Sequence, residues 1–136
     1  RIGELLASES LRIIQKAPVL DNPAVFIASR PLTFPVESDI MRYIIQKSSM
    51  KYESFSDNKV TTQLNLINIG PAQILTVPGE AMPNVGYYVK RNMNTTMPFL
   101  FGLTNDAFGY MLAKVDFHSF KRYEYVTRTS QGEMTA

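Results

Sequence analysis

The sequence predicts a mixed α/β fold, with a partly antiparallel mixed sheet flanked by helices. Residues 1–17 have the apolar spacing of an amphipathic helix, and residues 60–69 alternate as a strand does. A turn and a second apolar run at 72–77 follow, which is the pattern of a hairpin. A further helical pattern at 85–94 precedes another apolar run at 96–103. Helices and strands in this order, with one hairpin among them, are typical of mixed α/β layers.

Size and composition indicate one soluble globular unit. The chain has 136 residues, of which 45% are hydrophobic and 19% are charged, enough for one ordinary core. Its 14 basic and 12 acidic residues are scattered along the chain, so a nucleic-acid role has no support. There is no cysteine, so a metal would need imidazole, carboxylate or phenolate ligands. The chain begins at Arg1 without Met, and we expect it to be part of a longer protein.

The N-terminal third predicts a helix, an irregular strand and a second helix. The helix at 1–17 is closed by Pro18, and its apolar stripe is Ile2, Leu5, Leu6, Ile13 and Ile14. Residues 24–34 are strand-like but contain Pro31, which favours an edge or a bent strand. Ser38 can cap a short helix that runs through Lys47, with an apolar stripe of Ile40, Met41, Ile44 and Ile45.

The middle of the chain predicts a loop and then a hairpin. Residues 48–58 are polar and indicate an exposed loop. In the strand at 60–69 the apolar phase slips by one position after Leu66, which predicts a bulge or a bend near Leu66. Gly70 and Pro71 form the turn into the strand at 72–77.

The last third predicts a helix and a strand before an aromatic-rich end. The helix at 85–94 should place Val85, Tyr88 and Val89 inward, and the run at 96–103 should be a buried strand. The segment after Tyr110 is mixed, with the aromatic residues Phe117, Phe120, Tyr123 and Tyr125.

Two oxygen-bearing side chains follow the apolar runs, where α/β proteins collect ligands. Glu80 follows Pro78 and Gly79, and its carboxylate could ligate a metal, act as a base, or cap the helix that starts near Asn84. By spacing alone a cap or turn carboxylate is the simpler interpretation. Tyr110 closes a glycine-rich segment, and its phenol could donate to an oxyanion or ligate a metal, with packing as the ordinary alternative.

The remaining candidates are weaker. His118 is the only histidine, and a single imidazole cannot build a histidine-rich zinc site, so we interpret it as incidental. Asp106 and Asp116 are of the residue type that more often occupies turns and helix caps than acts as a catalytic acid. No nucleophile elbow, zincin motif or phosphate-binding loop is present.

Three blocks resemble the end of the catalytic domain of the neutral ceramidase family, also called alkaline or non-lysosomal. Residues 74–80 resemble its apolar strand ending in Pro-Gly-Glu. Residues 99–105, followed by Tyr110, resemble its Gly-Leu-x-Asn block and the tyrosine after it. Residues 122–124 with 127–130 resemble its Tyr-Glu-x-x-Ser ending. The blocks occur in the family's order at compatible spacing, and the likeness spans most of the chain.

The resemblance implies a zinc-dependent amidohydrolase that acts on the N-acyl bond of ceramide or a related lipid amide. It makes Glu80 and Tyr110 ligands of Zn²⁺ and places Tyr123 against the scissile amide as a catalytic residue. Two further histidine ligands and the active-site serine would come from upstream of this chain. Residues 1–136 would then be the C-terminal part of a ceramidase-like catalytic domain whose upstream part is absent, and we expect this piece alone to be inactive.

The partners implied are a lipid amide substrate, a membrane surface touched peripherally, and the remainder of the catalytic domain or a second copy of the chain. The alternative is a non-catalytic α/β binding or scaffold domain. The aromatic-rich stretch at 99–125 favours that alternative, because exposed aromatic side chains make good contact surfaces.

Overall fold

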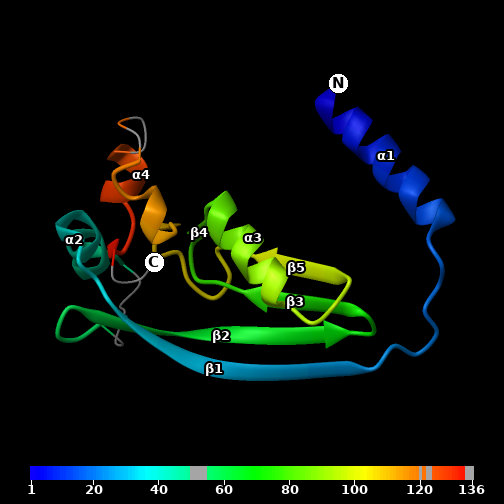
Figure 1. Ribbon diagram of the computed structural model, residues 1–136, viewed down its shortest axis with the longest axis horizontal. Helices are drawn as coiled ribbons and strands as arrows, with labels where there is room; N and C mark the ends of the chain where they lie inside the picture. The colour runs from blue at the N-terminus through cyan, green and yellow to red at the C-terminus, as the bar shows by residue number, and fades with distance from the viewer. Residues whose placement is uncertain (50–54, 120, 122–123, 134–136) are drawn as a thin grey trace.

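The computed structural model describes residues 1–49, 55–119, 121 and 124–133. The fold is mixed α+β, as predicted (Figure 1). The elements in chain order are α1 (Ile2–Lys16), β1 (Val25–Pro35), α2 (Asp39–Lys47), β2 (Lys59–Ile69), β3 (Ala72–Thr76), β4 (Glu80–Ala81), α3 (Pro83–Asn92), β5 (Met97–Phe101), β6 (Tyr110–Met111), the 3-10 helix η1 (Lys114–Asp116) and α4 (Glu124–Arg128). Among the described residues, none of the helices combines the length and the hydropathy that a membrane span requires.

Four strands form the main sheet in the order β1-β2-β3-β5. The predicted hairpin of β2 and β3 is confirmed as an antiparallel pair, and β1 also runs antiparallel to β2. β5 lies parallel to β3, and α3 makes the connection between them and packs against β5 (Figure 1). β4 and β6 form a separate parallel pair. The sheet is therefore mixed, as the sequence indicates.

Two predictions about the strands have opposite outcomes. Pro31 does lie in an edge strand, since β1 has only β2 as a neighbour. Of the bulge or bend predicted near Leu66, the bulge is wrong, because β1 and β2 pair without interruption from Val25 with Ile69 to Pro35 with Lys59. The slip in apolar phase instead marks the point where the apolar side chains of β2 change from one face of the sheet to the other.

The main core lies where α2 meets the end of β1, the start of β2 and the segment before β6. Its buried members are Val36, Met41, Ile45, Val60 and Phe108, with Phe34 and Phe55 packed against them. The rings of Phe34 and Phe108 meet edge to face, with centroids 5.8 Å apart.

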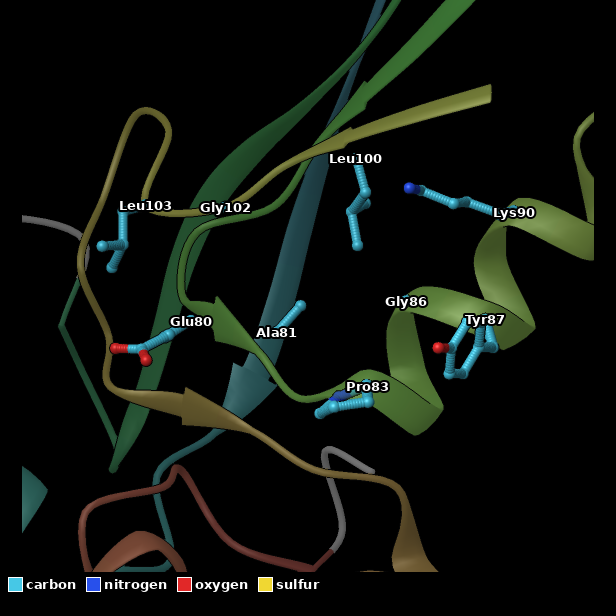
Figure 2. A pocket seen from close by; sticks show the side chains of 9 residues that line it. All are labelled: Glu80, Ala81, Pro83, Gly86, Tyr87, Lys90, Leu100, Gly102 and Leu103. Atoms are coloured by element: carbon cyan, nitrogen blue, oxygen red, sulfur yellow. The ribbon is translucent and has the colours of Figure 1, made fainter. Parts of the chain in front are cut away.

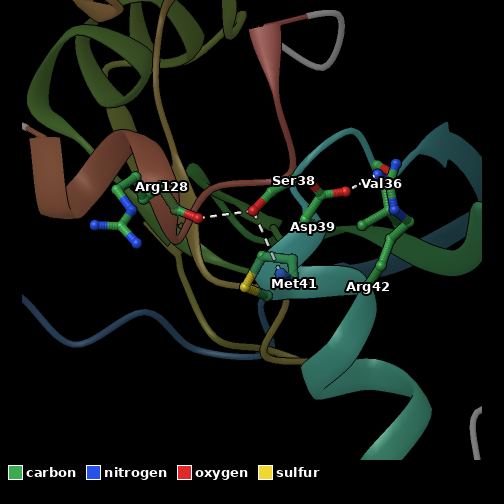
Figure 3. A network of polar contacts seen from close by, with 6 residues as sticks. All are labelled: Val36, Ser38, Asp39, Met41, Arg42 and Arg128. Carbon is green, nitrogen blue, oxygen red and sulfur yellow. Dashed lines mark hydrogen bonds and ion pairs between the residues drawn. The ribbon is translucent and has the colours of Figure 1, made fainter.

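The N-terminus of α2 joins this core to the C-terminal segment (Figure 3). The predicted cap is confirmed, because Ser38 Oγ accepts from the amide of Met41 at 3.3 Å. The same hydroxyl donates to the carbonyl of Arg128 at 2.7 Å, and Arg42, which pairs with Asp39, donates to the carbonyl of Val36 at 3.0 Å. α4 is thereby fixed against α2.

One face of the main sheet is apolar and uncovered. Residues paired in register share a face, and on this face they are Val25, Ile27, Ile67, Ile69, Ala72, Ile74, Met97 and Phe99. Val25 and Ile27 are 64% and 62% exposed. We call these eight residues the open face; α3 lies on the other face, where Leu100 approaches Gly86.

α1 forms where the spacing predicts but contacts little of the protein. It stands apart from the sheet (Figure 1), and all its residues are exposed, including the apolar stripe.

Tyr88 of α3 is also exposed, so the prediction that it faces inward is wrong, while its neighbours Val85 and Val89 are half-buried. β5 is a half-exposed edge strand rather than the buried strand predicted at 96–103, because only one of its faces is covered.

Candidate functional site

The structure pairs Glu80 with Tyr110. They are direct partners in the parallel pairing of β4 with β6, although 29 residues separate them in the sequence. The amide of Glu80 donates to the carbonyl of Gly109 at 2.9 Å, and the amide of Met82 donates to that of Met111 at 2.9 Å. Neighbouring strands lie about 4.8 Å apart, and paired residues project to the same side. The side chains of Glu80 and Tyr110 therefore start next to each other on the β4–β6 pair and project to the same side of it.

The three blocks that resemble ceramidases meet around this pair. Gly79, in the first block, accepts from the amide of Leu103 at 3.0 Å, in the second. Tyr110 donates its amide to the carbonyl of Thr129 at 3.1 Å and forms a β-bridge with Ser130, in the third. Segments far apart in the chain thus converge on one place.

Two glycines make the convergence sterically feasible. A Cβ on Gly79 would lie 2.5 Å from the carbonyl oxygen of Gly109, closer than atoms approach without a shift. Gly109 has φ of +82°, which L side chains rarely adopt, and a Cβ there would collide with the carbonyl oxygen of Thr129. Both positions require glycine because backbones touch there.

Electrostatics couple the two side chains. The pKa of Tyr110 is raised above the ordinary phenol value, first by the negative charge of Glu80, then by partial burial, then by Tyr125. The rings of Tyr110 and Tyr125 meet edge to face, with centroids 6.1 Å apart. In the absence of a cation the phenol keeps its proton at neutral pH and can act as a hydrogen-bond donor.

Glu80 and Tyr110 are suited to supply two of the four ligands of a zinc ion. Carboxylate and phenolate oxygens are hard donors that Zn²⁺ accepts, and structural and catalytic sites use four ligands or three plus an open position. Within the described residues no group of three or more His, Cys, Asp or Glu side chains could hold a metal. A zinc ion at Glu80 and Tyr110 would need further ligands from outside this chain.

The other candidates fall elsewhere. Glu80 is not a helix cap, so the cap interpretation is wrong: α3 is preceded by Met82, which makes no side-chain cap. Glu80 directly follows the bend at Pro78 and Gly79, as the alternative of a turn carboxylate has it. His118 is 85% exposed and lies 3.9 Å from Glu133. Asp116 accepts from the amide of Ala113, as a turn residue does, and Asp106 accepts from the hydroxyl of Thr62. Tyr123 lies outside the described residues.

A cavity adjoins each member of the pair. One of about 420 Å³ is lined by Glu80 and Ala81, by the start of α3 and by the end of β5 (Figure 2). In this view the Lys90 side chain extends from α3 toward Leu100. The second, of about 270 Å³, is lined by Tyr110 and Met111 together with residues of β1 and Gln131. Sequence reasoning missed Gln131, because its importance comes only from burial.

Comparisons of the chain with protein-family models, with curated proteins and with solved structures found no match. The resemblance to ceramidases therefore depends on the three blocks of residues, and the family stays a prediction.

Proposed function

We propose that Glu80 and Tyr110 are two of the ligands of a zinc-dependent amidohydrolase that cleaves the N-acyl bond of ceramide or a related lipid amide. The observation that supports the proposal is their direct pairing across β4 and β6. Glu80 and Tyr110 belong to separate blocks of the resemblance. Two ligands of one metal ion must lie next to each other, and these two residues do. The two histidine ligands belong to the upstream part of the domain, so this chain alone is inactive.

The residues of the chain have defined tasks in such a site. Zinc, when bound, supplies a Lewis acid that polarises the amide carbonyl and makes water nucleophilic near neutral pH. Glu80 would bind zinc through a carboxylate oxygen. Tyr110 can bind zinc only after its phenol has lost a proton, and the negative charge of Glu80 raises the pKa of that phenol. The cavity beside Tyr110, which is lined mostly by apolar side chains, can receive an apolar part of a lipid. Tyr123, as a donor to the developing oxyanion, remains part of the prediction.

Zinc binding to the protein with its complete catalytic domain tests the proposal. We expect Glu80→Gln and Tyr110→Phe each to abolish stoichiometric zinc, as measured by metal analysis after dialysis. Glu4→Gln on the exposed α1 and Tyr87→Phe beside the first cavity are matched controls that should retain it. Full zinc retention in both ligand variants would exclude this metal site.

The second candidate function is a non-catalytic binding or scaffold domain. The open face favours it, because apolar patches of this kind mark protein contact surfaces. The upstream sequence of the parent protein distinguishes the two functions. Two well-separated histidine motifs there favour the enzyme, and their absence favours the binding domain.

A further inference from the structure

We propose that the cavity beside Glu80 binds a ligand with an apolar chain and a carboxylate, and that the ammonium group of Lys90 pairs with this carboxylate. The cavity has a volume of about 420 Å³ and lies between α3 and the end of β5 (Figure 2). Ligand sites usually have volumes of roughly 300–1,000 Å³, so this cavity is large enough for a small amphiphile. The proposal depends on the cavity and on Lys90, and it holds whether or not zinc binds at Glu80.

One side of α3 forms the helical wall of this cavity. The α3 residues in the lining are Pro83, Gly86, Tyr87 and Lys90. Residues three, four and seven positions apart lie on the same side of a helix, so these four face one space. The apolar side chains that line the rest of the cavity are Ala81, Leu100 and Leu103. The lining thus combines apolar groups with the charged side chains of Lys90 and Glu80, and an amphiphilic ligand fits such a mixture.

Gly86 leaves part of this space open. It lies within α3, where glycine is among the least favourable residues. Its φ is not positive, so the backbone conformation does not require glycine. A Cβ at Gly86 would meet no atom outside its own helix closer than Leu100 Cδ2, at 4.0 Å, so close packing does not require glycine either. We interpret Gly86 as the residue that keeps the cavity free for a ligand.

Lys90 supplies a positive charge to the cavity. Its side chain is exposed and extends from α3 toward Leu100 (Figure 2). Among the described residues it forms no ion pair with a carboxylate. Glu80 lies on the other side of the cavity in the same view. The carboxylate of a ligand can therefore reach Lys90 without displacing a partner within this part of the protein.

The charges in the lining favour a ligand with a single negative charge. Of the described residues that line the cavity, Lys90 alone is cationic and Glu80 alone is anionic. A carboxylate balances the charge of Lys90. A phosphate group carries about two negative charges at neutral pH, and Glu80 would repel the second. The chemical class is therefore an alkyl carboxylate, or a larger molecule that contains one.

The position of Glu80 in the same lining connects this cavity to the proposed metal site. A ligand whose carboxylate pairs with Lys90 directs its other end toward Glu80. If the proposed amidohydrolase activity is correct, on which this step depends, the substrate would be a lipid amide with a carboxylate in one of its two halves. Ceramide has no such charge, so the inference narrows the substrate class to anionic lipid amides.

Two probes of nearly the same shape test the proposal on the metal-free 136-residue chain. Octanoate and methyl heptyl ketone differ in that only octanoate is charged. Titrations at low ionic strength are followed by the methyl NMR signals of Leu100 and Leu103, which line the cavity, with Ile27 on the open face as the control. We expect both probes to shift Leu100 and Leu103 at concentrations that leave Ile27 unchanged.

A matched pair of variants separates Lys90 from a general effect of charge. Lys90→Gln should weaken the binding of octanoate about two- to fivefold, the contribution of an exposed ion pair, and leave the ketone unchanged. Arg91→Gln removes a charge from the same last turn of α3 but from a residue outside the lining, so both affinities should stay as they are.

A third variant tests the cavity itself. Gly86→Leu places a side chain in the cavity and should abolish the binding of both probes. Its thermal unfolding midpoint should not fall, because leucine favours a helix more than glycine does. Equal octanoate affinities in the unmodified chain and in Lys90→Gln, shifts that bypass Leu100 and Leu103, or tighter binding of octyl phosphate than of octanoate would overturn the proposal. Because no zinc is present, failure here leaves the metal site to its own test.

Discussion

Gly79 and Gly109 touch backbone to backbone, since a Cβ on Gly79 would lie 2.5 Å from the Gly109 carbonyl oxygen. The amide of Glu80 donates to the same oxygen at 2.9 Å, so a side chain at position 79 would press on the pairing of β4 with β6. We expect Gly79→Ala to reduce the free energy of unfolding by about 1–3 kcal/mol, the usual cost of overpacking. Urea denaturation measures it. Gly3→Ala in the exposed α1, where a Cβ meets nothing within 4 Å, is the control and should leave stability unchanged or slightly increased.

Glu80 should control the ionisation of Tyr110. Its negative charge is the largest cause of the raised pKa, so Glu80→Gln should lower the pKa of Tyr110 toward the ordinary value of about 10. Titration of the tyrosine ring signals by NMR measures the change, and Tyr87 should titrate as before. An unchanged pKa for Tyr110 would show that the two side chains do not interact.

The same coupling gives stability a dependence on alkaline pH. A phenol whose pKa is raised by folding binds its proton more tightly in the folded state. Its contribution is therefore complete below the unfolded pKa of about 10 and is lost as pH rises through the folded value. Thermal unfolding between neutral and strongly alkaline pH should show this loss, and Tyr110→Phe should lack it.

Zinc affinity should rise with pH if the proposed site is correct. Tyr110 can act as a ligand only after losing its proton, and Glu80 opposes that loss until a cation is present. Zinc titrations of the complete domain at several pH values should show tighter binding and proton release as pH increases. Affinity independent of pH would mean that no phenol is deprotonated on binding.

Local patterns predicted most of the fold. The apolar spacing located α1 and α2, and the Ser38 cap and the hairpin after Gly70 follow from local chemistry. The prediction of a bulge at Leu66 was wrong because the alternation of apolar residues in one strand does not show which elements cover each face of the sheet. Different elements cover the sheet at different points along its length, and only the three-dimensional structure shows which face is covered at each point.

The candidate site was predicted in part. Glu80 and Tyr110 stood out as polar residues after apolar runs, but no local signal could place them opposite each other. Their pairing depends on backbone contacts across about thirty residues and on Gly79 and Gly109. Gln131 gave no signal at all, since glutamine is common on surfaces and only burial makes its oxygen notable.

The α2 cap should stabilise the link to α4. Ser38 satisfies the amide of Met41 and the carbonyl of Arg128, so Ser38→Ala removes two contacts (Figure 3). We expect a loss of about 0.5–2 kcal/mol, as for other caps, by urea denaturation. Ser8→Ala in α1 keeps the same chemical change at an exposed helical position and should have little effect. Equal losses in both variants would mean that the cap contributes nothing specific.

The open face should make the isolated chain self-associate. Specific interfaces bury about 1,200–2,000 Å² in total, and a sheet face of eight apolar residues can supply a large part of one partner's share. Sedimentation velocity should show concentration-dependent association. Ile27→Asp puts a charge on the open face and should reduce association, whereas Phe26→Asp puts the same charge on the opposite face of β1 and should not. Because both residues are well exposed, at 62% and 57%, the two charges differ mainly in which face they occupy. Equal behaviour of the two variants would assign any association to another surface, such as the apolar stripe of α1.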